Sequence, residues 1–354
     1  MNLRDELKAA VLNLSEKDRN FEPLALEIFR FQANQNPIYK AFLKNLGIRP
    51  SKVSYIEKIP CLPISFFKSQ AVISGKTNIE HTFESSGTTG SINSKHFISD
   101  LPFYEYLSLK TFELRYSPIT DYHILALLPS YLERSNSSLV YMAQSFIYKS
   151  FSEESGFYIN NLTELAKRLN SILNDNSDKR KILLFGVTFA LLDLIESNSF
   201  HFKYPEKLIV METGGMKGKR KEMLREDVQD RLKAAFNVPQ IHSEYGMTEL
   251  LSQAYSKGEG WFKNSATMKV LIREVNDPFA YLPSFEIGNK SSSKRKHRKT
   301  GGINVIDLAN IDSCSFIETQ DLGSFSEDYQ SFTVLGRFDN SDIRGCNLMS
   351  LSII

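Results

Sequence analysis

The sequence predicts an α/β fold in which layers of helix and partly parallel strand are joined to a smaller β-rich part. In the middle of the chain, short apolar runs that are typical of buried strands alternate with amphipathic helical stretches. In the last third, several strand-like runs follow one another without long helices between them. The first pattern is typical of a layered α/β sheet, and the second indicates a separate β-rich portion.

The N-terminal part is predicted to be helical, because Leu3, Leu7, Val11 and Leu14 fall on one helical face. Further helices are expected at 23–35, 37–46, 136–148 with Asn136 as its cap, 162–173, 189–197 and 219–236. Strands are expected at 123–128, 182–185, 208–211, 240–242, 268–275, 302–308, 315–319 and 332–335. The segment 59–68 contains two prolines and is expected to be extended.

These elements indicate one large domain over residues 1–335. Within it we expect a helical part at 1–80, an α/β part at 81–265 and a β-rich part at 266–335. Residues 336–354 are expected to form a hinge-like tail.

Composition narrows the class of protein. The 354 residues carry 43 basic and 41 acidic side chains, and the net charge of +2 gives no global reason to expect nucleic-acid binding. The basic run 294–299 is interpreted as a solvated loop, with a docking patch for an acidic partner as the alternative. The chain begins without an apolar signal region and has no run of about 18 apolar residues, so a cytoplasmic protein without a membrane span is expected.

The sharpest local motif is a Ser/Thr/Gly loop. Its glycines permit close approach to a ligand, and its backbone N–H groups and hydroxyls can surround a polyphosphate. A flexible surface turn is the alternative interpretation. Lys95 follows and can place a cation on a phosphate, or it is an ordinary exposed lysine. The residues of the loop are Ser85, Ser86, Gly87, Thr88, Thr89 and Gly90.

Three further motifs follow in order: Tyr-Gly-Met-Thr-Glu at 245–249, Thr-Gln-Asp-Leu-Gly at 319–323 and Gly-Arg-Phe-Asp at 336–339. Together with the loop, this order resembles the adenylate-forming superfamily of acyl-CoA synthetases, luciferases and peptide-synthetase adenylation domains. Within it the chain is most similar to the acyl-protein synthetases (LuxE type) of bacterial luminescence. The resemblance is near full-length and implies the large-domain fold of that superfamily.

The resemblance also implies roles for individual residues, with ATP and Mg²⁺ as cofactors. The Ser/Thr/Gly loop is expected to hold the β- and γ-phosphates. The remaining roles are adenine stacking for Tyr245, an α-phosphate hydrogen bond for Thr248, Mg²⁺ coordination for Glu249, ribose binding for Asp321, a ribose or phosphate contact for Arg337, and close approach to the nucleotide for Gly214, Gly215 and Gly246. Core packing, helix-start and turn roles are the structural alternatives.

Two residues are candidates for the chemistry itself. Cys346 matches the cysteine near the C-terminus that carries the acyl group in LuxE-type enzymes; a buried structural thiol is the alternative. His242 is expected either to contact the carboxylate or act as a base, or to be a satisfied histidine at a strand end. The other two cysteines, Cys61 and Cys314, are expected to be packing residues.

The chain departs from the superfamily in two ways. Four residues separate Gly90 from Lys95, whereas a lysine usually follows almost directly. The usual small C-terminal domain with its catalytic lysine is expected to be absent. Either another cation such as Lys217, Lys219 or Arg344 replaces that lysine, or adenylation relies on Mg²⁺ and on helix or nest dipoles.

The sequence therefore predicts an acid–thiol ligase that activates a fatty acid as an acyl-adenylate and transfers it to a protein thiol, with a partner such as an acyl reductase as final acceptor. An acyl-CoA or other acyl ligase of phenylacetate-CoA ligase type is one alternative, and a non-catalytic nucleotide-binding subunit is another. The sequence does not fix acyl chain length, final acceptor, pathway or oligomeric state.

Overall fold

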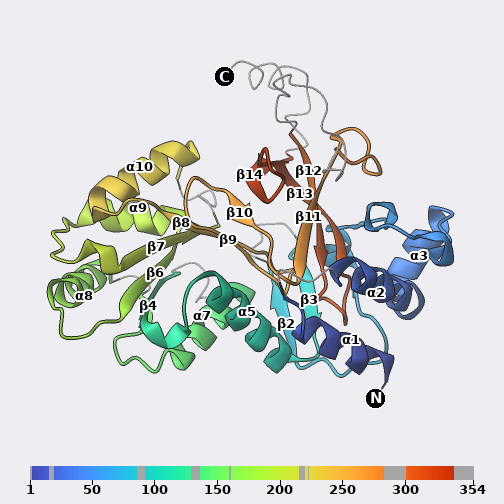
Figure 1. The fold of residues 1–354 in the computed structure, drawn as a ribbon, viewed down its shortest axis with the longest axis horizontal. Coiled ribbons are helices and arrows are strands. Elements are labelled where there is room, and N and C mark those ends of the chain that lie inside the picture. Colours follow the sequence, from blue (N-terminus) through green and yellow to red (C-terminus); the bar gives the residue numbers. More distant parts are fainter. Residues whose placement is uncertain are drawn as a thin grey trace.

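A computed structural model describes residues 2–15, 20–85, 92–128, 136–158, 161–214, 220–221, 223–282 and 300–338. Within these residues a 12-stranded sheet runs through the molecule (Figure 1). Its strand order is β11-β12-β13-β14-β10-β9-β8-β7-β6-β4-β5, and β1 pairs with β13 off this path.

One half of the sheet is parallel, as the alternation of strand and helix predicts. Its strands are β4 (Tyr122–Leu127), β5 (Gly156–Tyr158), β6 (Lys181–Val187), β7 (Leu208–Thr213) and β8 (His242–Tyr245). Every residue of β4 is buried, because helices cover both faces. In Figure 1, α9 and α10 lie above these strands and α5 and α7 lie below them. The helices are α5 (Leu101–Arg115), α7 (Ser138–Lys149), α8 (Leu162–Asn174), α9 (Thr188–Ser197) and α10 (Arg225–Phe236).

The other half is antiparallel and continues the same sheet through the pairing of β8 with β9. Its strands are β9 (Ala254–Ser256), β10 (Phe262–Lys263), β11 (Met268–Arg273), β12 (Gly301–Asp307), β13 (Phe316–Phe325) and β14 (Ser331–Arg337). The expected boundary at 265/266 falls between β10 and β11. The division into helical, α/β and β-rich parts stays a prediction.

The N-terminal helices pack beside the antiparallel half, at the right of Figure 1. Phe29 and Tyr39 both contact the ring of Phe316 on β13. A separate two-stranded hairpin of β2 and β3 lies between these helices and the parallel half. The elements of this region are α1 (Leu3–Leu12), α2 (Phe21–Gln35), α3 (Pro37–Asn45), β1 (Leu62–Pro63), α4 (Phe66–Ser69), β2 (His81–Glu84) and β3 (Lys95–Ile98), with 3-10 turns at Pro50–Lys52, Ile56–Lys58, Ile119–Asp121 and Pro205–Lys207.

Several expected boundaries are wrong for local reasons. The helix before β8 begins at Arg225 rather than residue 219. Ser137, not Asn136, caps α7, because its side chain accepts the Val140 N–H. The segment 59–68 is not wholly extended, since Phe66 begins the one-turn helix α4. Leu3 is exposed, whereas Leu7, Val11 and Leu14 are buried as expected.

Two strand errors matter for the site. The strand expected at 240–242 instead starts at His242 and ends at Tyr245, so the Tyr-Gly-Met-Thr-Glu motif begins on a strand. The strand expected at 315–319 extends to Phe325, so Asp321 lies within β13 rather than in a turn. Among the described residues, no helix combines the length and apolar character that a bilayer crossing needs.

Gln32 is the polar link between α2 and the segment that joins β12 to β13. Its Nε2 donates to the carbonyls of Asn310 (2.7 Å) and Ile311 (3.1 Å), and its Oε1 accepts the Ser315 N–H (3.0 Å). We expect Gln32→Leu to lower the free energy of unfolding by about 2–4 kcal/mol, because it leaves buried backbone groups unpaired. The exposed Asn34→Ala is the control in urea unfolding. A Gln32→Leu variant as stable as this control would contradict the stabilising role of the Gln32 hydrogen bonds.

Candidate active site

The carboxyl ends of the parallel strands meet at one edge of the sheet, where α/β proteins bind ligands. Buried hydroxyl–carboxylate bonds connect neighbouring strands at this edge. Thr188 and Ser243 donate to Glu212, and Thr213 donates to Glu244 at 2.6 Å. These bonds hold the strand ends in register and place the half-buried Glu212 and the buried Glu244 at this edge.

The loop that leaves this edge after β8 carries Thr248 and Glu249, and both of their carbonyls are held. His96 Nδ1, on β3, lies 2.8 Å from the Thr248 carbonyl oxygen. A carbonyl only accepts, so the His96 proton is on Nδ1. Asn310 Nδ2 donates to the Glu249 carbonyl at 2.8 Å. The motif is therefore held by hydrogen bonds from two segments that are distant in sequence.

A third anchor follows directly. The Asp307 carboxylate accepts the N–H groups of Leu251 (2.7 Å), Ser252 (3.0 Å) and Ala309 (3.0 Å), and the Ser252 hydroxyl (2.6 Å). Asp307 is fully buried at the end of β12. It acts as a positioning residue that fixes the loop after β8 to the antiparallel half.

Sequence reasoning assigned no role to His96, Asn310 or Asp307. Their partners are backbone groups, and no local spacing in the sequence announces such contacts. The only sequence signal was that Asp307 and Asn310 lie in the stretch 301–310, which resembles the synthetase family.

Glu249 is the predicted magnesium ligand. It is only 5% exposed, and burial raises the pKa of its carboxyl group, while a hydrogen bond with Ser94 opposes the shift. The charge of Arg337 lowers the same pKa, and the charge of Asp321 raises it. A desolvated carboxylate with these neighbours fits a hard divalent cation, which would favour its charged form.

Ser85, the first residue of the predicted phosphate loop, is bonded to Ser94, which hydrogen-bonds to this carboxylate. Ser85 N–H donates to the Ser94 carbonyl (3.1 Å), and the Ser94 N–H donates to Ser85 Oγ (2.8 Å). The ends of the segment are thereby joined next to Glu249. Lys95 lies 3.8 Å from Glu84 across the β2–β3 hairpin and is half exposed.

Tyr245, Asp321 and Arg337 come together as the resemblance implies. The Tyr245 hydroxyl donates to Asp321 Oδ2 at 2.8 Å, and Arg337 Nε lies 3.3 Å from Oδ1. Each carboxylate oxygen can accept a second bond, so Asp321 retains capacity for ribose hydroxyls. The Tyr245 ring is buried against Phe262 and Phe332, with centroids 5.8 and 5.6 Å away.

Two of the predicted glycines occupy positions that favour glycine. Gly214, directly after β7, has φ +76°, which favours glycine. At Gly246 an added Cβ would lie 2.4 Å from Glu244 Oε1, so a side chain there would displace the buried carboxylate.

His242 lies at the start of β8, at the other end of the strand from Gly246. Its Nδ1 is 3.0 Å from the Tyr116 hydroxyl. Burial, and then the charge of Lys257, lower the pKa of His242 to about 4, so it is neutral at pH 7. The structure does not bring it to the Thr248–Glu249 loop.

The thiols differ sharply in setting. Cys61 and Cys314 are buried packing residues, as expected. Burial raises the pKa of Cys61 to about 12 and that of Cys314 higher still, so neither forms a thiolate readily. Cys346 lies outside the described residues.

Several other predicted sites also lie outside the described residues: Ser86, Gly87, Thr88, Thr89 and Gly90 of the phosphate loop, Gly215, and the basic run 294–299. The described part of the chain holds no group of three or more His, Cys, Asp and Glu side chains that could bind a metal alone.

The described residues form an α/β sheet with carboxylates at the carboxyl edge of its parallel strands. Over residues 6–353 the sequence matches the profile of the family described as "Acyl-protein synthetase, LuxE", and the chain belongs to that family. No curated protein matched the sequence.

Two solved structures are similar in fold. One is an adenylation domain of a keto acid-selecting NRPS module bound to keto acyl adenylate, with 11% identity, a TM-score of 0.47, and coverage of 76% of this chain and 53% of that one. The other is a red-emitting luciferase from Phrixothrix hirtus, with 14% identity, a TM-score of 0.41, and coverage of 85% and 50%. The chain thus spans about half the length of these structures.

The buried His96 gives a pH-dependent prediction. Burial lowers its pKa to about 4 from an ordinary value of about 6.5. Its neutral form therefore contributes stability that is complete above about pH 6.5 and is lost as the pH falls toward 4. We expect the free energy of unfolding of the wild type to fall more steeply than that of His96→Asn in this window, by up to about 1.4 kcal/mol per pH unit.

The exposed His201→Asn is the matched control and should keep the wild-type slope in urea unfolding at stepped pH. Parallel slopes for wild type and His96→Asn would contradict the assignment of a buried neutral imidazole.

Proposed function

We propose that this protein uses ATP to activate a fatty carboxylic acid as an acyl-adenylate and then transfers the acyl group to a protein thiol. The observation that carries the proposal is that three motifs far apart in the chain meet at one carboxylate: Tyr245 donates to Asp321, and Arg337 Nε lies 3.3 Å from it. Membership of the acyl-protein synthetase family supports the same chemistry. Because the reaction consumes ATP, we place it in the cytoplasm.

In the first step, a carboxylate oxygen of the acid attacks the α-phosphorus of ATP. The bond from that phosphorus to the bridging oxygen of the β-phosphate breaks, and pyrophosphate leaves. The carbonyl carbon then carries AMP as a good leaving group, which a free carboxylate lacks.

We propose the following roles for the residues, which the family resemblance suggests and the contacts of the described residues support. Asp321 binds the ribose hydroxyls, with Tyr245 and Arg337 fixing its two oxygens. Thr248 contacts the α-phosphate. The backbone carbonyl of Thr248 is held in place by a hydrogen bond from His96 Nδ1. The loop that begins at Ser85 surrounds the outer phosphates, and Glu249 holds Mg²⁺. When bound, the cation offsets negative charge that develops on the phosphates.

In the second step, a thiolate attacks the acyl carbon, the carbon–oxygen bond to AMP breaks, and a thioester forms. Three cysteines are present in the sequence. Since Cys61 and Cys314 are buried with raised pKa values, Cys346 is the proposed carrier. A partner protein such as an acyl reductase is the proposed final acceptor.

The magnesium role of Glu249 is tested by Glu249→Gln, which keeps the size of the side chain and removes its charge. We expect the acid-dependent exchange of pyrophosphate into ATP to fall at least about 100-fold, because the charge that positions the cation is lost. Glu164→Gln, on the exposed start of α8, is the control. Exchange by Glu249→Gln within about threefold of this control would remove Glu249 from the mechanism.

The carrier role is tested with labelled tetradecanoic acid, ATP and Mg²⁺ in the absence of CoA. Wild type, Cys61→Ala and Cys314→Ala are expected to acquire hydroxylamine-sensitive label, whereas Cys346→Ala is expected to lose it, because thioester formation needs an accessible thiolate. Label on Cys346→Ala would contradict the carrier role. If acyl-AMP forms but no protein acquires label, the adenylation step stands and the acyl acceptor is another molecule. Formation of acyl-CoA after addition of CoA would identify CoA as that acceptor.

A further inference from the structure

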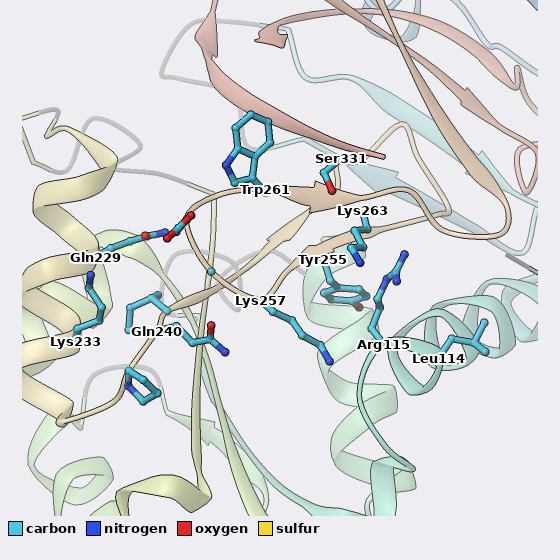
Figure 2. Close-up of a pocket in the computed structure, with 14 residues that line it drawn as sticks. Leu114, Arg115, Gln229, Lys233, Gln240, Tyr255, Lys257, Trp261, Lys263 and Ser331 are labelled. Carbon is cyan, nitrogen blue, oxygen red and sulfur yellow. The ribbon is translucent and has the colours of Figure 1, made fainter. Parts of the chain in front are cut away.

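A cavity lies away from the proposed nucleotide site. Its volume is about 590 Å³, and it is bounded by the end of α5, by α10, by the segment 239–241 and by the turn between β9 and β10 (Figure 2). Ile241 lines it directly before β8, whereas Gly246 follows the other end of that strand. Four strand residues span about 13 Å, so the strand separates the two sites. This volume suits a small molecule.

The wall of the cavity is strongly basic. It carries Arg115, Lys233, Lys257 and Lys263 against the single acid Glu259. Figure 2 shows Arg115, Lys257 and Lys263 on the same side of the cavity. Lys233 has a partner, since its Nζ lies 2.6 Å from Asp230.

Lys257 and Lys263 differ from Lys233, because no carboxylate in the described part of the chain forms an ion pair with either of them. Lys257 Nζ lies instead over the Tyr116 ring, 5.1 Å from its centroid. Burial lowers the pKa of Lys257, and the charges of Arg115, Lys263 and Lys181 lower it further. The wall carries four cationic side chains and one acid, and this excess of positive charge favours an anionic occupant.

An aromatic side chain completes the wall. Trp261 lines the cavity, and in Figure 2 its indole lies at the upper rim, apart from Arg115, Lys257 and Lys263. A flat apolar surface beside several cations suits a ligand that combines phosphate charge with an organic group.

We propose that this cavity is a binding site for a phosphate-bearing small molecule, separate from the site of ATP-dependent acid activation. Lys257 and Lys263 bind the phosphate oxygens, Arg115 adds charge, and Trp261 packs against the remainder of the ligand. The inference does not depend on the proposed adenylation chemistry, because it rests on the cavity and its charges alone.

The test uses a reporter that is already in place. Trp261 is the only tryptophan in the sequence, so its fluorescence, excited at about 295 nm, reports on this cavity. We expect inorganic tripolyphosphate, added to the full chain without acid substrate, to change this fluorescence in a saturable way. In Lys257→Gln/Lys263→Gln, the Kd should rise at least about tenfold, because charge-assisted bonds are lost.

Lys167→Gln/Lys203→Gln is the matched control, since it removes the same charge from exposed lysines that do not line the cavity. Its Kd should stay within about twofold of wild type. Glu259→Gln should bind more tightly than wild type, because it removes the one acid of the wall. The Kd of phenyl phosphate is compared with that of inorganic phosphate to distinguish two kinds of ligand. Tighter binding of phenyl phosphate would indicate that the ligand is an organic phosphate ester, and equal binding would indicate free phosphate.

Two results would overturn the proposal. One is the absence of any fluorescence change with tripolyphosphate or phenyl phosphate. The other is equal weakening in the cavity variant and the matched control, which would show general charge attraction instead of a site. Loss of adenylation activity bears on neither result, because the readout needs no turnover.

Discussion

The buried carboxylate of Asp307 accepts three backbone N–H groups and one hydroxyl, from Leu251, Ser252 and Ala309. This cluster joins the loop after the last parallel strand to the end of β12 in the antiparallel half. Without it, the segment that carries Thr248 and Glu249 would be tied to the antiparallel half chiefly through Asn310. The positions of the proposed catalytic groups therefore depend on a residue that itself contacts only protein.

The site is assembled from both halves of one continuous sheet. The parallel half supplies its carboxyl edge, with Glu212 and Glu244 held by hydroxyls of neighbouring strands. The antiparallel half supplies Asp321 and Arg337, and the β2–β3 hairpin supplies Ser85, Ser94 and His96. Such an arrangement explains why the motifs are short and scattered along the chain. Each motif is local, and the pairing of strands brings them together.

The sequence predicted the type of most elements and the motifs of the site, because hydrophobic periodicity and short motifs are local signals. It ended one strand before Tyr245 and the other before Asp321, because cross-strand pairing extends β8 and β13 beyond their apolar runs. His96 and Asp307 could not be found, since both bind backbone groups that only the folded chain brings near. The basic cavity was missed for the same reason: its four cations come from three separate stretches of sequence.

The proposed mechanism requires that a carboxylate oxygen of the acid attacks the α-phosphorus of ATP. Tetradecanoic acid labelled with ¹⁸O in its carboxylate, incubated with ATP, Mg²⁺ and the wild-type chain, tests this directly by mass spectrometry of the released nucleotide. The mechanism predicts AMP that carries one ¹⁸O, because the attacking carboxylate oxygen stays on the α-phosphorus when the thiolate displaces AMP. Unlabelled AMP, or ADP with ¹⁸O in inorganic phosphate, would contradict adenylation and point to a different route of activation.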